Sequence, residues 1–296
     1  MNFEERFGTD SPLIGMVHLP ALPGAPGYGG RREAIRAAAL GDARALAEAG
    51  FDGLLVENFG DVPFYPDDVP KHVVAEMTAI ARELDIAVDL PWGANVLRND
   101  AGAALSVAAA AGGAFVRVNV HTGTADTDQG LLEGQAHRTL RLRERVDADV
   151  AVLADVAVKH AASPDREVGV LAREAIDRGL ADALVVSGPE TGEAVASEQL
   201  QAVLEARDGA TRDVPVLVGS GVTPDNAAVL LELADGAIVG TAVKRDGVTA
   251  NRVNPERGRA LVEAAVGEEA AGSDAATEPP AENEPEVAGE PEAGGE

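Results

Sequence analysis

Apolar residues are concentrated in short continuous runs along the chain, and many of these runs follow a helical segment that ends near a glycine. This arrangement is repeated four times, in residues 47–58, 109–120, 175–188 and 230–242. Glycine is favoured at the C-terminal end of a helix because it adopts a left-handed backbone conformation without strain. Four further apolar runs lie between these segments, at residues 13–18, 87–90, 150–155 and 216–219. The pattern therefore predicts eight short strands.

Alanine-rich segments of helical length separate the strands. The clearest of them are residues 31–49, 69–84, 100–111 and 165–178. Strands that are apolar along their whole length are typical of a parallel sheet covered by helices. Eight strand–helix units within residues 1–267 agree with the roughly 250 residues of a (β/α)8 barrel. The sequence predicts a single TIM barrel, with an open doubly wound sheet as the alternative.

The segment 268–296 differs in composition from the barrel region. It consists mainly of Glu, Pro, Ala and Gly, with ten acidic residues and no Lys or Arg. Such a segment buries too little apolar surface to offset the entropy lost on ordering. We therefore expect residues 268–296 to form a disordered acidic tail, which either solubilises the protein or binds a partner.

The charge of the chain is strongly negative even without this tail. The chain has 24 basic and 50 acidic residues, a formal charge of −26, of which −16 belongs to residues 1–267. This charge argues against binding to nucleic acids or to anionic membranes. Only three of the 24 basic residues are lysines. An acidic surface with few lysines suggests a halophilic protein from a high-salt cytoplasm.

Several classes of protein are excluded by what the sequence lacks. Without cysteine, disulfides, thiolate nucleophiles and cysteine-based metal sites are ruled out. Residues 1–10 do not resemble a signal peptide, and no apolar run approaches the ~18 residues of a membrane span. No dinucleotide-binding glycine motif follows a strand. We expect a cytoplasmic protein without a predicted cofactor, a divalent metal at His18 and Glu57 being the alternative. A homo-oligomer is also expected, because symmetric association is common among barrel enzymes.

Polar side chains follow the expected strands, and the C-terminal ends of the strands are where barrel enzymes hold their active sites. In chain order these side chains are His18, Glu57, Asn58, Asp89, Trp92, Asn95, Asn119, His121, Asp155, Lys159, His160 and Ser187, the last followed by Gly188. Asp155 and Lys159 predict an acid–base pair or, as the alternative, a structural ion pair at the barrel mouth. Glu57 and His121 complete the expected catalytic set. His18, Asn119, His160, Ser187 and Gly188 are expected to contact the substrate.

The last two strands are followed by glycine-rich turns that predict a phosphate site. These turns are Gly219-Ser220-Gly221 and Gly240-Thr241. Glycine lets the backbone approach a ligand closely, and in many barrels this position binds phosphate through backbone N–H groups. The residues Thr223-Pro224-Asp225 predict a helix start with Thr223 as its N-cap. The alternative is that the glycines only form tight turns.

Two segments after the second and third strands are further candidates. Arg98 is expected to grip an anionic ligand, while Asn99 or Asp100 caps the helix that follows. The segment 59–65 holds three of the nine aromatic residues. We expect it to be a lid, an oligomer contact or simple packing over the barrel mouth.

Several segments, in this order along the chain, resemble the BtpA family. They are IGMVHLP at 14–20 with LPGAP behind it, VENFGDVPF at 56–64, NVLRND at 95–100, ADVAVKHA at 154–161, Ser187-Gly188 with Thr191-Gly192, GSGVTPDN at 219–226, and VGTAVKRDG at 239–247. The resemblance covers residues 11–265. It implies a barrel related to the ribulose-phosphate-binding group of TIM barrels.

The resemblance also implies two different functions. The family takes its name from the biogenesis of photosystem I, whereas a member encoded among sugar-metabolism genes is regarded as a nucleosidase or sugar enzyme. Members in organisms without photosystems argue for a more general role. We therefore expect an enzyme, of lyase, isomerase or hydrolase type, that binds a phosphorylated sugar or nucleoside-like molecule at the barrel mouth. A noncatalytic assembly or stability factor is the alternative.

Overall fold

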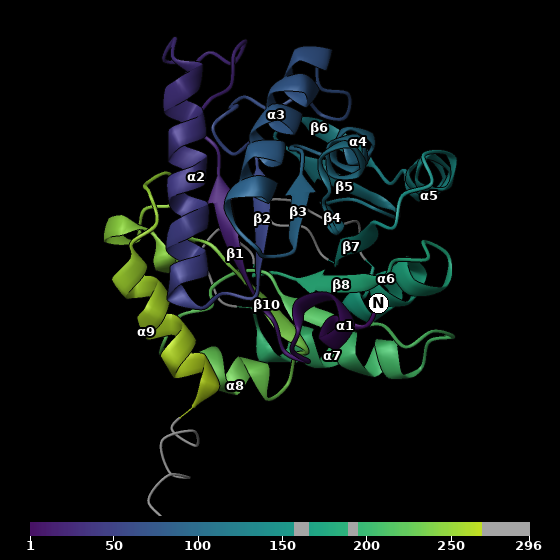
Figure 1. The fold of residues 1–296 in the computed structure, drawn as a ribbon. Helices are drawn as coiled ribbons and strands as arrows, with labels where there is room; N and C mark the ends of the chain where they lie inside the picture. The colour runs from purple at the N-terminus through teal and green to yellow at the C-terminus, as the bar shows by residue number, and fades with distance from the viewer. Residues whose placement is uncertain (157–165, 189–194, 268–296) are drawn as a thin grey trace, which may run out of the picture.

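The computed structural model describes residues 1–156, 166–188 and 195–267, and its eight parallel strands form a closed barrel (Figure 1). The strands follow one another around the barrel in the order β1-β10-β9-β8-β7-β4-β3-β2. Their bounds are β1 (Leu13–His18), β2 (Gly53–Glu57), β3 (Trp92–Asn95), β4 (Phe115–Val118), β7 (Ala151–Val156), β8 (Ala183–Val186), β9 (Val216–Val218) and β10 (Gly236–Val239). Every residue of these strands is buried. The prediction of a TIM barrel is confirmed.

Helices surround the barrel, as Figure 1 shows. They are α1 (Phe3–Phe7), α2 (Arg32–Ala49), α3 (Lys71–Ala87), α4 (Ala101–Ala111), α5 (Ala136–Arg145), α6 (Val168–Asp177), α7 (Ser197–Asp208), α8 (Ala227–Leu231) and α9 (Pro255–Val266), with short 3-10 turns at Thr241–Val243 and Arg245–Gly247. Gly50 and Gly112 end α2 and α4 in the left-handed conformation, as the glycine pattern predicted. Within the described residues, no helix is long and apolar enough to cross a membrane.

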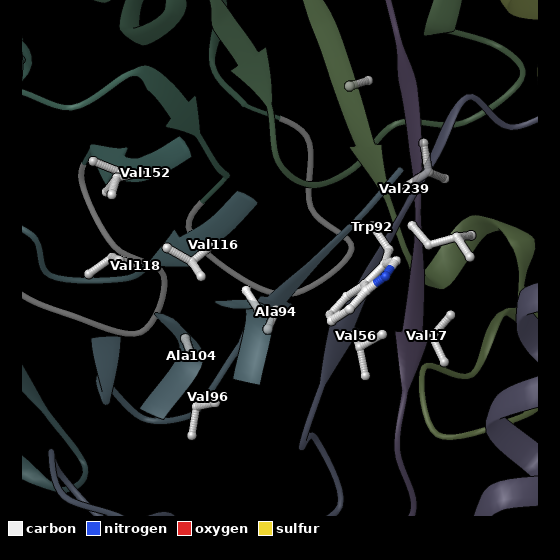
Figure 2. Close-up of a cluster of buried hydrophobic side chains, with 14 of the residues drawn as sticks. Val17, Val56, Trp92, Ala94, Val96, Ala104, Val116, Val118, Val152 and Val239 are labelled. Atoms are coloured by element: carbon white, nitrogen blue, oxygen red, sulfur yellow. The ribbon is translucent and has the colours of Figure 1, made fainter. Parts of the chain in front are cut away.

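The apolar side chains of the strands point alternately into the barrel and toward the helices. Ile14, Met16 and Phe115 belong to the inner cluster, which Phe3 and Phe7 of α1 join from below. The Phe7 and Phe115 ring centroids lie 5.8 Å apart. The outer cluster contains Val17, Val56, Trp92, Ala94, Val96, Val116, Val118, Val152 and Val239 (Figure 2). The two layers explain why the strands are apolar along their whole length.

The third strand lies further along the chain than the sequence pattern predicted. Residues 87–90 were expected to form it, and that expectation is wrong, because α3 continues to Ala87 and Asp89 is exposed in the turn before the strand. The strand begins at Trp92, whose indole nitrogen donates to Asp85 at 3.0 Å and whose ring packs in the outer cluster. Trp92 and Asn95 are therefore part of the strand and do not follow it.

A hairpin that the sequence did not predict follows β4. It consists of β5 (Thr124–Thr127) and β6 (Gly130–Glu133), paired antiparallel. Ala125 and Leu132 bury one face of the hairpin against Val120. The hairpin turn thereby brings Asp128 to the mouth of the barrel.

Candidate functional site

A cavity of about 670 Å³ opens at the C-terminal ends of the barrel strands. Its lining comes from β1, β2, β4 and β10, from the segments that follow β2, β3, β4, β9 and β10, and from α9. The lining residues are Met16, His18, Glu57, Phe59, Val62, Phe64, Leu97, Arg98, Arg117, Asn119, Asp128, Gly219, Ser220, Gly221, Val222, Thr223, Ile238, Gly240, Thr241, Ala242, Gly247 and Arg257. This is the end of the barrel at which the sequence predicted the site.

Nine of the candidate residues predicted from the sequence line this cavity. They are His18, Glu57, Arg98, Asn119, Gly219, Ser220, Gly221, Gly240 and Thr241. Four others, His121, Asp155, Ser187 and Gly188, do not line it. Lys159 and His160 lie outside the described residues, so their assignments stay predictions.

Arg117 and Asp155 form a bidentate ion pair beneath the cavity. The Arg117 side chain comes from β4 and donates from Nε at 2.7 Å and from Nη2 at 2.9 Å to the two Asp155 carboxylate oxygens of β7. Asn119 Nδ2 donates to the same carboxylate at 3.1 Å. Burial by itself would lower the pKa of Arg117, but the charge and hydrogen bonds of Asp155 outweigh it and hold that pKa above its ordinary value. The ion-pair partner of Asp155 among the described residues is therefore Arg117, which the sequence did not indicate; the expected pairing of Asp155 with Lys159 involves a residue outside the described ranges and stays a prediction.

His18 and Glu57 form a histidine–carboxylate couple in the wall of the cavity. They end the neighbouring strands β1 and β2 and are directly opposite each other in the strand register. His18 Nε2 lies 3.7 Å from Glu57 Oε1, and both residues are buried. The His18 ring also packs against Phe59, with 4.8 Å between the ring centroids. A histidine held beside a carboxylate is suited to moving protons to and from a ligand.

His121 faces away from the cavity. It is buried between the end of β4 and the C-terminal end of α6, where its Nε2 lies 2.8 Å from the Gly179 carbonyl oxygen. Burial lowers the pKa of His121 below its ordinary value. This environment fits a neutral packing histidine, and a neutral imidazole there donates its Nε2 proton to Gly179.

The turn after β9 is shaped by its own side chains. Asn226 Nδ2 donates to the Gly221 carbonyl at 2.9 Å, and Asn226 Oδ1 accepts from Thr223 N at 2.8 Å. Gly221 has φ +67°, a conformation that glycine adopts without strain. Thr223 was expected to be an N-cap, and this is wrong: α8 begins at Ala227 after Asn226 and has only five residues. The turn is therefore a backbone loop rather than the start of a long helix.

The loop after β9 is linked to the end of β8, and the loop after β10 is linked to α9. Ser220 Oγ accepts from Gly188 N at 2.8 Å, which ties the β9 turn to the end of β8. Arg257 of α9 donates from Nε to the Ala242 carbonyl at 2.8 Å and lines the cavity beside the β10 turn. A guanidinium next to two glycine turns gives this side of the cavity the character of an anion site.

Three residues of the cavity were missed by the sequence reasoning. Arg117 lies in the apolar segment FVRV, and a charged residue within a buried strand indicates a paired or functional group. Arg257 and Asp128 come from α9 and from the unpredicted hairpin, and no local pattern pointed to either. Among the described residues, no group of three or more His, Asp and Glu side chains is arranged to hold a metal ion.

Comparison with known sequences identifies the family. A sequence model of the BtpA family matches residues 9–267. The chain belongs to the BtpA family. An uncharacterized family relative from Thermococcus kodakarensis is 49% identical over 266 residues, 90% of this chain and 97% of that protein. The photosystem I biogenesis protein BtpA of Synechocystis is 43% identical over 267 residues, 89% of this chain and 91% of that protein. The resemblance expected from the sequence motifs is confirmed.

Solved structures share the barrel of this BtpA-family protein. Tryptophan synthase of Mycobacterium tuberculosis gives a TM-score of 0.53 at 22% identity, covering 86% of this chain and 91% of that chain. N-(5'-phosphoribosyl)anthranilate isomerase of Pyrococcus furiosus gives 0.52 at 13% identity, covering 86% and 98%. At these identities the likeness shows the fold alone.

Proposed function

We propose that this BtpA-family barrel is an enzyme that binds a phosphorylated sugar or nucleoside-like molecule and begins its reaction with a proton transfer. One observation carries the proposal: a single cavity is lined both by two glycine-rich turns beside an arginine and by a histidine–glutamate couple. The first arrangement suits an anion and the second suits acid–base chemistry. Their combination in one cavity supports the proposal of a substrate that is anchored at one end and reacts at another.

The turns after β9 and β10 would bind the phosphate group. Backbone N–H groups of Gly221 and Thr241 are the donors, and Arg257 adds positive charge at the rim. Local positive charge is needed because residues 1–267 have a formal charge of −16, which repels anions at long range. The name of the phosphoribosylanthranilate isomerase, a barrel of the same fold, agrees with a phosphorylated ligand.

His18 and Glu57 would carry the proton transfer. A neutral His18 accepts a proton from the bound substrate, and the adjacent Glu57 carboxylate stabilises the imidazolium that forms. Returning that proton to another substrate atom gives an isomerisation, and returning it to a leaving group gives a lyase reaction. In a hydrolase reaction His18 would instead take the proton from an attacking water molecule and return it to the leaving group. Asp155 is assigned a positioning role in this scheme, because its carboxylate holds Arg117 and Asn119 below the substrate.

Ligand-dependent thermal stability tests the phosphate site. The protein is heated in high salt with ribose 5-phosphate, with nucleoside monophosphates and with the matching unphosphorylated compounds. A ligand at 100 times its Kd adds about 2.7 kcal/mol to the free energy of unfolding, which moves Tm measurably. We expect phosphorylated compounds alone to raise Tm, and Gly221→Asp to remove that rise.

The matched control is Gly41→Asp, which adds the same charge on the exposed face of α2, where a new side chain meets no neighbour within 4 Å. This variant should keep the full Tm rise. Equal responses of the two variants, or a rise with the unphosphorylated compounds, would contradict the phosphate site.

The Synechocystis relative supports a second candidate function. That protein, 43% identical to this chain, is named for photosystem I biogenesis, which is an assembly role. A noncatalytic assembly or stability factor would use the barrel rim or the segment 268–296 to bind a protein partner. The two functions differ in one outcome: His18→Asn should abolish cellular function if the protein is an enzyme, and should preserve it if the barrel only binds a partner.

A further inference from the structure

We propose that the substrate carries a second anionic group, a carboxylate or a second phosphate, and that Arg98 binds it across the barrel mouth from the phosphate turns. This inference rests on the proposed function and specifies its substrate class. It starts from the position of Arg98. Arg98 follows β3 and lines the same cavity as Gly221, which follows β9.

The closed strand order places these two residues on opposite sides of the mouth. Around the ring, β3 and β9 are separated by three strands in either direction, through β2, β1 and β10 or through β4, β7 and β8. A cavity that contacts the ends of both strands therefore extends across the barrel. Its volume of about 670 Å³ exceeds what a single phosphate group fills and lies in the range of sites for whole small molecules.

Arg98 is carried by a loop whose backbone is held in place. Arg98 N donates to the Tyr65 carbonyl at 2.9 Å. The preceding residue, Leu97, donates from its N to Asn58 Oδ1 at 2.7 Å, and Asn58 is itself buried at the end of β2. Because the backbone of this loop is fixed, only the side chain of Arg98 has to be ordered when an anion binds, and two parallel hydrogen bonds to a carboxylate or phosphate are the preferred geometry of a guanidinium.

The other charges of the cavity favour this assignment. Arg117 is paired with Asp155, so its charge is largely neutralised inside the protein. Arg257 lies beside the β10 turn, at the phosphate side. Arg98 is the cationic side chain of the β3 loop, and Phe59, Val62 and Phe64 line the cavity from the loop after β2. The cavity thus has a cation on each of two sides, with apolar wall and the His18–Glu57 couple as further lining.

Asp128 is a second acidic residue of the cavity, besides Glu57 of the His18–Glu57 couple. It lines the cavity from the β5–β6 turn with a negative charge, and its carboxylate accepts from the side chain of Gln129. The negative charge of Asp128 repels anionic groups bound in the same cavity. Asp128→Asn should therefore tighten a ligand with two anionic groups more than a ligand with a single phosphate.

The test compares two pairs of ligands. The members of each pair share one phosphate group and differ only at the opposite end of the molecule. Sorbitol 6-phosphate and 6-phosphogluconate are open six-carbon chains with one phosphate, and the second has a carboxylate in place of a hydroxymethyl group. Fructose 6-phosphate and fructose 1,6-bisphosphate form the corresponding pair for a second phosphate. Calorimetric Kd values are measured for wild type, Arg98→Met, Arg98→Lys and the control Arg259→Met, all at one salt concentration. Arg259 is exposed on α9 and does not line the cavity.

We expect wild type to bind at least one doubly anionic probe about 10-fold more tightly than its partner, a ratio equal to about 1.4 kcal/mol. Arg98→Met should reduce the ratio to near one and change the Kd of the singly phosphorylated probe less than about threefold. Arg98→Lys should keep part of the ratio, and Arg259→Met all of it. Circular dichroism and the unfolding midpoint check that each variant is folded.

The outcomes separate this inference from the proposed function. A wild-type ratio near one for both pairs, with sorbitol 6-phosphate or fructose 6-phosphate bound, overturns the second anionic group and leaves the phosphate site standing. Equal weakening of both members of a pair by Arg98→Met also overturns it, because Arg98 would then only shape the cavity. Failure of all four probes to bind counts against the proposed function and against this inference with it.

Discussion

The Arg117 guanidinium and the Asp155 carboxylate meet below the cavity through two parallel hydrogen bonds of 2.7 and 2.9 Å, with the two side chains only 5% and 1% exposed. Both charges are largely removed from bulk water, so each depends mainly on the other for its solvation. The pair also connects β4 to β7, and Arg117 Nη2 reaches Ser187 Oγ after β8 at 3.4 Å. It therefore fixes the barrel on the side where the hairpin is inserted.

Removing one partner of this ion pair should strongly lower the free energy of unfolding. Asp155→Asn leaves the buried Arg117 charge without its counter-ion, and we expect a loss of about 3–5 kcal/mol in the free energy of unfolding. The double variant Arg117→Met/Asp155→Leu removes both charges and should recover most of that loss. Urea unfolding of the three proteins measures both effects. A loss below about 1 kcal/mol for Asp155→Asn would show that the pair is not solvating Arg117.

The His18–Glu57 couple should affect proton transfer far more than binding. His18→Asn removes the base, and we expect a decrease of about 100-fold or more in the rate of the proton-transfer step. That step can be followed without knowing the product. In D2O, the NMR spectrum of a bound phosphate ester shows the exchange of one of its hydrogens for deuterium. The Kd of the ester should change less than threefold. Unchanged exchange would remove His18 from the mechanism.

Lys244 should make the free energy of unfolding depend on pH in the alkaline range. Its side chain is fully buried, with Nζ 3.0 Å from the Met16 carbonyl oxygen and 3.3 Å from Asp42 Oδ2, and Arg252 also contacts Asp42. Burial lowers the pKa of Lys244 to about 8, although Asp42 and the more distant Glu57 oppose that shift. Between about pH 8 and 10.5 the unfolded chain holds a proton that the folded chain has released. The free energy of unfolding from this group therefore rises with pH, by about 3 kcal/mol in total.

The comparison of wild type with Lys244→Met isolates this contribution. Between pH 8 and 10.5, the free energy of unfolding of wild type should rise relative to that of Lys244→Met. Lys71→Met, a variant of a lysine exposed on α3, is the matched control for the loss of a lysine side chain. Parallel pH profiles for wild type and Lys244→Met would mean that Lys244 titrates as it does in the unfolded chain.

Gly60 should tolerate no side chain. A Cβ at this position would meet the backbone of the loop after β1, at 2.6 Å from Pro20 C and at a still closer contact with Ala21 N. Backbone atoms cannot move aside as a flexible side chain does, so Gly60→Ala is expected to cost about 1–3 kcal/mol of stability. Gly29→Ala, with no neighbour within 4 Å, is the matched control and should be nearly neutral. Similar unfolding midpoints for both variants would contradict this close packing.

The sequence predicted most of the fold because apolar runs and glycine helix ends are local features. It failed at β3, where the strand WGAN contains little apolar sequence and the apolar residues before it extend α3. It also missed the hairpin, since TADT and GLLE bury only Ala125 and Leu132. Neither element had a pattern strong enough to be distinguished from a turn.

The site was predictable in its location and less so in its composition. Strand ends brought His18, Glu57 and the glycine turns together because they meet at one rim. Spacing could not show that Asp155 lies beneath the cavity against Arg117, since that depends on β4 and β7 being neighbours across an inserted hairpin. Arg257 reaches the rim from the last helix, and only the packing of α9 against the Thr241–Val243 turn brings it there.

The packing of α1 has a consequence for how the cavity is used. Phe3 and Phe7 join the inner core at the N-terminal end of the strands and close that end of the barrel. Ligands therefore enter the cavity through the rim at the C-terminal end. If the barrel is an enzyme, as proposed, substrate and product enter and leave through this one opening. A protein partner bound at the rim, one of the two surfaces considered for an assembly role, would block that opening. Catalysis and complex assembly by this BtpA-family barrel would then be mutually exclusive in time.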